Sequence, residues 1–162
     1  MDLLEEAYNF CEIGEYEKAL VCYDKVLQND PNNIRALIDK GVTLQNLDQV
    51  KESLLLYDRA LEIAPKNIDA LLNNGSALHT LKRFIEAIRC YDEVLKLDKK
   101  NTMALAYKGL SLAELGEVEE ALEYFKSALE LDKYYDLASI SIEKAKEILK
   151  SYKKLSTQTS LD

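Results

Sequence analysis

The stretch CYDKVLQNDPNN at residues 22–33 reappears as CYDEVLKLDKKN at residues 90–101, which is 68 residues further along the chain. Between and beyond the two copies, Gly41, Gly75 and Gly109 follow one another at intervals of 34 residues. The two stretches are therefore two periods apart in one repeating pattern. A repeat of this length is typical of proteins that stack one small structural unit several times.

Each unit contains two segments with helical spacing of small and apolar residues. Recurrence at three and four residues places such residues on one side of a helix. We therefore expect each unit to be a pair of antiparallel helices, in which small residues let the helices approach and large residues fill the space between them. The two halves of the third unit illustrate the spacing: Leu71, Gly75, Leu78 and Leu81, then Phe84, Ala87, Tyr91 and Val94.

The turns and helix starts carry matching signals. Gly14 and Gly116 stand where the turn inside a unit favours a left-handed backbone. Asp48 and Lys82 occupy the same place in the middle units, whose turns we expect to be strained or differently shaped. Asparagine side chains are well suited to accept the first free amides of a helix. Three of them precede the second, third and fourth units: Asn33, Asn67 and Asn101.

This pattern resembles the tetratricopeptide repeat, whose unit is a 34-residue helix-turn-helix, over about residues 1–135. The resemblance rests on a small residue at the eighth place of each unit, Ala or Ser at the twentieth, Tyr or Phe at the twenty-fourth, and Pro31 and Pro65 at the thirty-second. Two places depart from the family. The fourth holds Leu where the family often has Trp, and the seventh is often apolar in the family but here holds Glu6, Lys40, Asn74 and Lys108.

The resemblance implies an all-α fold, a right-handed α-solenoid of antiparallel helix pairs with nine helices. The repeats are expected at residues 1–33, 34–67, 68–101 and 102–135. A capping helix is expected at 136–154, with Leu137, Ile140, Ala145, Ile148 and Tyr152 facing inward, and a mobile tail at 155–162. No matching cap precedes the first unit, which we expect to be frayed or covered by another molecule.

Composition narrows the classes of function. The formal net charge of −8 and the pI near 4.8 argue against nucleic-acid binding, which depends on clustered Lys and Arg. No apolar run has the length of a membrane span, and the acidic start MDLLEEAYNF is unlike a secretory signal, so a cytoplasmic location is expected. The cysteines, Cys11, Cys22 and Cys90, are odd in number and lack a C-x-x-C motif, which predicts reduced thiols.

Catalysis is not predicted. The single histidine, His79, has no nucleophile that the sequence places beside it, and the abundant carboxylates follow the outer sides of the helices, where charge promotes solubility. No Gly-rich phosphate loop or set of metal ligands occurs. We therefore expect a protein that is not an enzyme, with no catalytic residues, no metal and no cofactor.

A candidate binding surface follows from the resemblance, which implies that the first helix of each unit lines a concave groove. The core stripe of these helices uses places four, eight, eleven and fourteen, so places five, nine and twelve are expected to face the groove. An apolar strip of this extent usually marks a contact surface. It consists of Leu4, Tyr8, Cys11, Ile38, Val42, Gln45, Leu72, Ser76, His79, Ala106, Leu110 and Ala113.

Two alternatives stay open for this strip. Strong curvature would close the groove, so that the side chains contact one another, or the C-terminal helix or its tail would fold back into it. In either case the strip would not be available to a partner.

Charge indicates what kind of partner would fit. Acidic residues surround the strip at Glu5, Glu12, Asp39, Asp69 and Glu114, against Arg35 alone. Chaperone-binding members of the family hold a terminal carboxylate with a clamp of Lys, Arg and Asn, but those places hold Leu4, Tyr8, Asp39, Asp69 and Asn73 here. An acidic tail would be repelled, whereas an apolar, neutral-to-basic segment would be complementary.

The sequence thus predicts a protein-interaction module, an adaptor that binds an apolar, neutral-to-basic peptide or helix in its concave groove. Asn73 is the candidate for hydrogen bonding to the ligand backbone, and Tyr107 is the candidate aromatic anchor. The rival hypothesis is a structural subunit that self-associates into a homo-oligomer through the groove or the uncapped first repeat.

Overall fold

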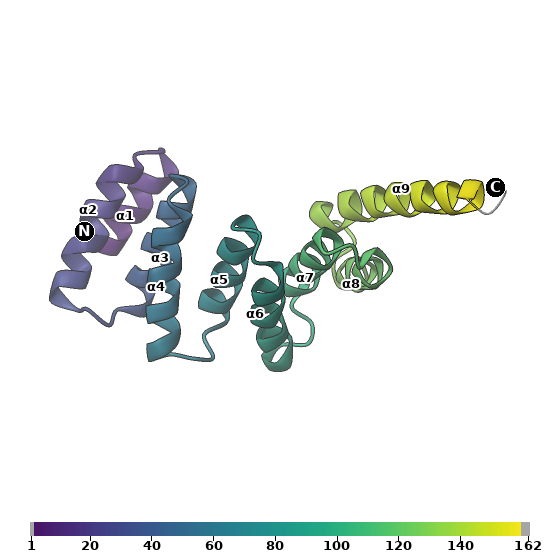
Figure 1. The fold of residues 1–162 in the computed structure, drawn as a ribbon. Helices are drawn as coiled ribbons and strands as arrows, with labels where there is room; N and C mark the ends of the chain where they lie inside the picture. Colours follow the sequence, from purple (N-terminus) through teal and green to yellow (C-terminus); the bar gives the residue numbers. More distant parts are fainter. Residues whose placement is uncertain (1, 160–162) are drawn as a thin grey trace. The chain divides into compact units, whose positions relative to one another are not determined.

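The computed structural model describes the backbone of residues 2–159 and the side chains of residues 2–147, 149 and 150. Within these residues the chain is all-α, as predicted, and forms nine helices (Figure 1). These are α1 Leu3–Glu12, α2 Tyr16–Asn29, α3 Ile34–Asn46, α4 Val50–Ile63, α5 Ile68–Thr80, α6 Phe84–Leu97, α7 Thr102–Glu114, α8 Val118–Leu131 and α9 Asp136–Thr159. They belong to two compact units, Met1–Arg83 with α1–α5 and Phe84–Asp162 with α6–α9.

Helices that follow one another in sequence pack against one another inside each unit. In the first unit α1 packs on α2, α2 on α3, α3 on α4 and α4 on α5; in the second, α6 packs on α7, α7 on α8 and α8 on α9. First helices of neighbouring pairs also touch, since α3 contacts α5 directly. This is the sequential antiparallel packing that the repeat predicts.

Small residues face large ones inside the helix pairs. A Cβ atom built on Gly41 would lie 2.4 Å from the Tyr57 ring, and one on Gly109 would lie 2.6 Å from the Phe125 ring. Tyr57 and Phe125 are both buried. Glycine is therefore required at Gly41 and Gly109, because a side chain at either position would displace the facing aromatic ring of the second helix.

The predicted caps and turns are confirmed. The side chains of Asn33, Asn67 and Asn101 accept hydrogen bonds from the backbone amides of Ala36, Ala70 and Ala104 at 3.0, 2.9 and 2.9 Å. Asp48 and Lys82 adopt φ values of 61° and 60°, in the left-handed region that Gly14 and Gly116 also occupy. The two middle turns are thus strained at non-glycine residues.

The unusual seventh place joins neighbouring repeats. Lys40 pairs with Asp24 at 2.5 Å, Asn74 donates to Asp58 at 2.9 Å, and Lys108 pairs with Asp92 at 2.6 Å. In each case the acidic residue lies 16 positions earlier, on the second helix of the preceding pair. The polar residues that depart from the family pattern therefore act as partners across the junction between repeats.

The final helix covers the end of the second unit through a stripe that partly matches the predicted one. Ala145 is buried and Leu137 packs against the core around Phe125, as predicted. Ala138, Ile142 and Ala145 are buried, and Ala138 and Ile142 join the core around Phe125. The prediction that Ile140 faces inward is wrong, because its side chain is 67% exposed. Two positions along a helix turn a side chain to roughly the opposite side, so Ile140 and Ile142 cannot both face the core.

The end of the chain is described only in part. The backbone of α9 continues to Thr159, beyond residue 154 where the cap was expected to end, and residues 160–162 lie outside the described residues. The predicted inward side chains of Ile148 and Tyr152 also lie outside them. The repeat boundaries and the mobile tail at 155–162 stay predictions.

Candidate functional site

The fifth-place residues do not form an open groove floor. Ile38, Leu72 and Ala106 are buried, with at most 7% of their surface exposed, and Leu4 is half-buried. The expectation that these three buried side chains face a partner is wrong. Neighbouring first helices contact one another, α3 with α5 and α7 with α9, so the fifth place lies in the contact between them.

The remaining predicted residues keep some exposed surface. The Tyr8 side chain is exposed, at 56%. The others are half-buried, apart from the exposed Arg35: Cys11, Val42, Gln45, Asn73, Ser76, His79, Tyr107, Leu110 and Ala113. The surface that a partner could reach is therefore narrower and more polar than the sequence suggested.

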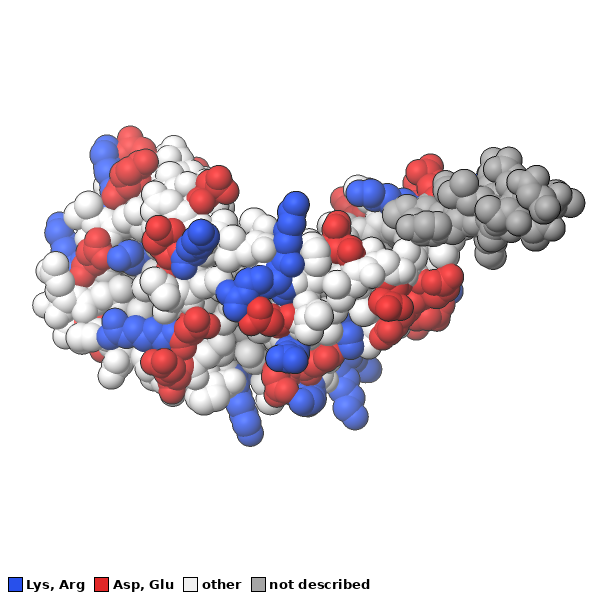
Figure 2. All heavy atoms as spheres, viewed as in Figure 1, with Lys and Arg blue, Asp and Glu red and all other residues white. Residues whose placement is uncertain are grey.

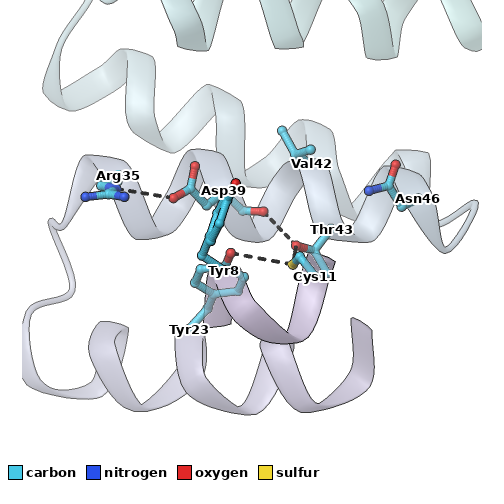
Figure 3. A pocket seen from close by; sticks show the side chains of 8 residues that line it. All are labelled: Tyr8, Cys11, Tyr23, Arg35, Asp39, Val42, Thr43 and Asn46. Carbon is cyan, nitrogen blue, oxygen red and sulfur yellow. Dashed lines mark hydrogen bonds and ion pairs between the residues drawn. The ribbon is translucent and has the colours of Figure 1, made fainter. Parts of the chain in front are cut away.

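A hollow of about 350 Å³ lies where α1 and α3 meet in the first unit (Figure 3). Its wall combines aromatic, aliphatic and charged side chains, and five of its members come from α3. The lining residues are Tyr8, Cys11, Tyr23, Arg35, Asp39, Val42, Thr43 and Asn46. Four of them, Tyr8, Cys11, Arg35 and Val42, belong to the predicted groove, so sequence reasoning located part of this site.

A chain of polar contacts fixes the base of the hollow. The Cys11 Sγ atom lies 3.8 Å from the Tyr23 hydroxyl and 3.4 Å from Thr43 Oγ1, which donates to the backbone oxygen of Asp39 at 2.9 Å. Burial raises the pKa of Tyr23 above its ordinary value, so the hydroxyl stays neutral. These contacts tie α1, α2 and α3 together and hold the hollow in one shape.

Asp39 is the charged centre of the hollow. Its Oδ2 atom lies 3.5 Å from Arg35 Nε, one turn earlier on the same helix, and the two side chains are 39% and 69% exposed. Desolvation by burial raises the pKa of Asp39, Arg35 opposes that rise, and the negative charge of Asp69 adds to it. The carboxylate is therefore held where its charge is only partly compensated.

A second hollow adjoins the first. It measures about 360 Å³ and is lined by Asp2, Glu5, Tyr8 and Arg35, so Tyr8 and Arg35 contribute to both. Across the two hollows three carboxylates stand against one guanidinium. The surface around Tyr8 is therefore acidic, although Figure 2 shows acidic and basic side chains interspersed on the face of the first unit that it presents.

The predicted residues of the second unit are occupied by local packing. Leu110 and Ala113 pack against the core around Phe125. The Tyr107 ring lies 5.9 Å from the Tyr91 ring, centroid to centroid, at an interplanar angle of 34°. Tyr107 is therefore partly engaged with its own unit, and the more open site lies in the first unit.

Asn73 uses its amide group within its own helix, because Nδ2 donates to the backbone oxygen of Asp69 at 2.8 Å. Because the NH2 group carries two hydrogens, a ligand backbone could meet its second N–H or the acceptor oxygen of this side chain. The role predicted for Asn73 stays a prediction.

The sequence reasoning missed three lining residues, Tyr23, Thr43 and Asn46, and assigned a fourth, Asp39, only to the acidic surroundings of the strip. Tyr23 was assigned to the core stripe of the second helix, and its ring is indeed buried. Its hydroxyl nevertheless reaches the hollow. The one available signal was that the twenty-fourth place holds Tyr in some units and Phe in another. A buried tyrosine hydroxyl needs a polar partner, so Tyr23 could have been expected to contact polar side chains.

The described residues offer little for other chemistry. Among them, no group of three or more His, Cys, Asp and Glu side chains is placed to hold a metal ion. None of the helices described is both long enough and apolar enough to cross a membrane. What the site presents is a shaped, acidic surface with an exposed aromatic ring.

Comparison with known proteins places this geometry in context. A family model described as tetratricopeptide repeat matches residues 4–68 and 72–136. No curated protein matched the sequence.

Solved structures similar to the chain include a crystal structure of MamA, with 22% identity and a TM-score of 0.79 over 90% of this chain and 79% of that one. YrrB, described as a TPR protein with an unusual peptide-binding site, is 24% identical with a TM-score of 0.73 over 91% of this chain and 76% of its own. The first TPR of Spaghetti (RPAP3), bound to the HSP90 peptide SRMEEVD, is 24% identical with a TM-score of 0.69, covering 74% and 95%. These similarities bear on the fold, the tetratricopeptide superhelix.

Proposed function

Because the chain belongs to the tetratricopeptide repeat family, whose repeats typically form non-catalytic scaffolds for protein interaction, we propose that it is an adaptor for a protein segment. The segment is apolar and neutral to basic, and it binds along the first-helix side of Met1–Arg83. The observation that carries this proposal is the hollow beside the exposed Tyr8 ring, bounded by Asp39 and Val42.

The similar structures support peptide binding as the general mode. Two of them are described by a peptide-binding site or a bound peptide. The peptide bound to Spaghetti contains two glutamates and an aspartate. In this chain the two hollows are lined by Asp2, Glu5 and Asp39, so a peptide of that charge would be repelled there.

The test is calorimetric titration of the full chain with three acetylated, amidated peptides that alternate Leu with Lys, Ser or Glu. We expect the Lys peptide to bind best and the Glu peptide worst. Tyr8→Ala and Val42→Asn should each weaken the Lys peptide about tenfold, because they remove the aromatic contact or replace an apolar contact with a polar group.

The control is Leu55→Asn. Leu55 is 70% exposed on α4, the second helix of its pair, so this change puts the same polar group on a surface outside the hollow. Unchanged affinity is expected. Equal losses for Leu55→Asn and Val42→Asn, or no binding of any peptide, would contradict the proposal.

Self-association is the second candidate function. Ile13 on the turn after α1 is 69% exposed and Phe10 is half-buried, whereas Leu44, which holds the place of Phe10 in the next repeat, is buried. Helix α1 packs on α2, and α2 packs on α3. Light scattering across a range of protein concentrations separates the two candidates, because a strict monomer excludes the homo-oligomer.

A further inference from the structure

The first hollow differs from a simple apolar groove in having a carboxylate at its centre. Asp39 lies on α3 between Arg35 and Val42, with the Tyr8 ring from α1 as the opposite wall (Figure 3). At about 350 Å³, the hollow is large enough to hold one large side chain. The hollow thus combines an aromatic face, an aliphatic wall and an anionic end.

Charge around Asp39 is unbalanced. Arg35 approaches with one nitrogen at 3.5 Å, on an exposed side chain. Such pairs contribute little, and an Arg that precedes its acidic partner on a helix is the less favourable order. Asp2 and Glu5 line the adjoining hollow, and Asp69 is near enough to raise the pKa of Asp39 further. A cation entering here meets more negative than positive charge.

Structural need does not explain Asp39. The acidic residues that support the fold, Asp24 and Asp58, reach across to the next repeat and pair with Lys40 and Asn74. Asp39 makes its ion pair within its own helix, and burial disfavours its charged form. A charged side chain that lowers the stability of the folded protein is typical of a binding site, because residues that serve binding often reduce stability.

We infer that this hollow is a subsite for one Lys or Arg side chain of the bound segment, whose cationic end pairs with Asp39 and displaces Arg35. The aliphatic stem of that side chain lies against Val42, and the cation passes over the face of the Tyr8 ring. The inference rests on the proposed function, since it names the residue that the groove selects.

The test uses two peptides that are identical except for one central residue, Arg or the uncharged norleucine, titrated into the full chain by calorimetry. Asp39→Asn should weaken the Arg peptide at least tenfold and leave the norleucine peptide within about twofold, because only the Arg peptide loses a charge-assisted hydrogen bond. Arg35→Gln should strengthen the Arg peptide about threefold, since it removes the competing cation.

Glu62→Gln is the matched control. Glu62 is exposed on α4, and its change alters the net charge as Asp39→Asn does, but outside both hollows. It should leave both peptides unaffected. If Glu62→Gln and Asp39→Asn had equal effects, the attraction would come from net charge and the subsite would be refuted.

The outcomes separate this inference from the proposed function. If both peptides bind and Tyr8→Ala weakens both, but Asp39→Asn does not distinguish them, the groove stands and the subsite is refuted. If a peptide with Glu at the central position binds more tightly than the Arg peptide, Arg35 is the recognition residue and the inference is overturned. If none of these peptides binds, both proposals fail.

Discussion

At the scale of single residues, the turn inside each repeat depends on a left-handed backbone that two repeats supply without glycine. Lys82 has φ 60° and Asp48 has φ 61°. Asp tolerates this region better than Lys, because its short polar side chain can form local hydrogen bonds. The strain should therefore be greater at Lys82.

Replacing Lys82 with glycine should stabilise the protein by about 0.5–1 kcal/mol. This is the strain free energy that the change relieves, minus the larger entropy cost of ordering a glycine on folding. Thermal unfolding should shift upward by a few degrees, on the order of 2–4 °C per kcal/mol. Lys82→Ala is the control, since it removes the charge and keeps the Cβ atom. An equal gain from Lys82→Ala would show that backbone strain is not the cause.

Asp39→Asn should leave the fold at least as stable at neutral pH. Burial raises the pKa of Asp39 in the folded state, so the folded protein disfavours the carboxylate relative to the unfolded chain. That cost is full at neutral pH and fades as pH falls through the raised pKa, because the side chain then becomes protonated. The gain of Asp39→Asn over the natural protein should accordingly shrink on acidification.

Thermal melts of both proteins from neutral pH down to about pH 4, near the ordinary pKa of Asp, measure this. A large loss of stability at neutral pH would instead make Asp39 a structural residue.

At the scale of helices, polar pairs across the repeat junctions supplement apolar packing. Lys108 is only 9% exposed, contacts Asp92 and Tyr124 at 2.6 and 2.7 Å, and lies over the Tyr124 ring at 4.4 Å. Burial lowers the pKa of Lys108, but the hydrogen bonds to Asp92 and Tyr124 outweigh it and leave the pKa raised. These hydrogen bonds therefore stabilise the folded protein fully at neutral pH, and the stabilisation is lost as the pH rises through the raised pKa of Lys108.

A double-mutant cycle on Asp92→Ala and Lys108→Ala should reveal a coupling free energy of about 1–3 kcal/mol by denaturant unfolding. The partly exposed pair of Lys96 and Glu93 is the control, because both side chains lie on one helix in solvent. Its coupling should be much smaller, because solvent screens both charges. Additive losses at Asp92 and Lys108 would contradict the role of this pair in joining the repeats.

The helices themselves were largely predictable because the signals are local. Asn33, Asn67 and Asn101 mark helix starts through contacts three residues away, and Gly41 faces Tyr57 within one helix pair. The junction pairs were not predicted. Their partners are 16 residues apart on different helices, so only the packing of one repeat on the next brings them together.

At the scale of the whole molecule, the candidate site was only partly predictable. The sequence identified the side of the helices that carries it, including Tyr8, Arg35 and Val42. It could not show that Ile38 and Leu72 are buried, since that depends on how closely successive first helices approach.

The most direct test of the central claim, that the first-helix side of Met1–Arg83 binds a basic segment, is a two-dimensional amide NMR titration of the full chain with the Arg peptide. The account predicts the largest shift changes on α1 and α3 around Tyr8, Asp39 and Val42, with smaller changes on α5 and little change on α2 and α4. Changes confined to α2 and α4, or absent throughout Met1–Arg83, would contradict it.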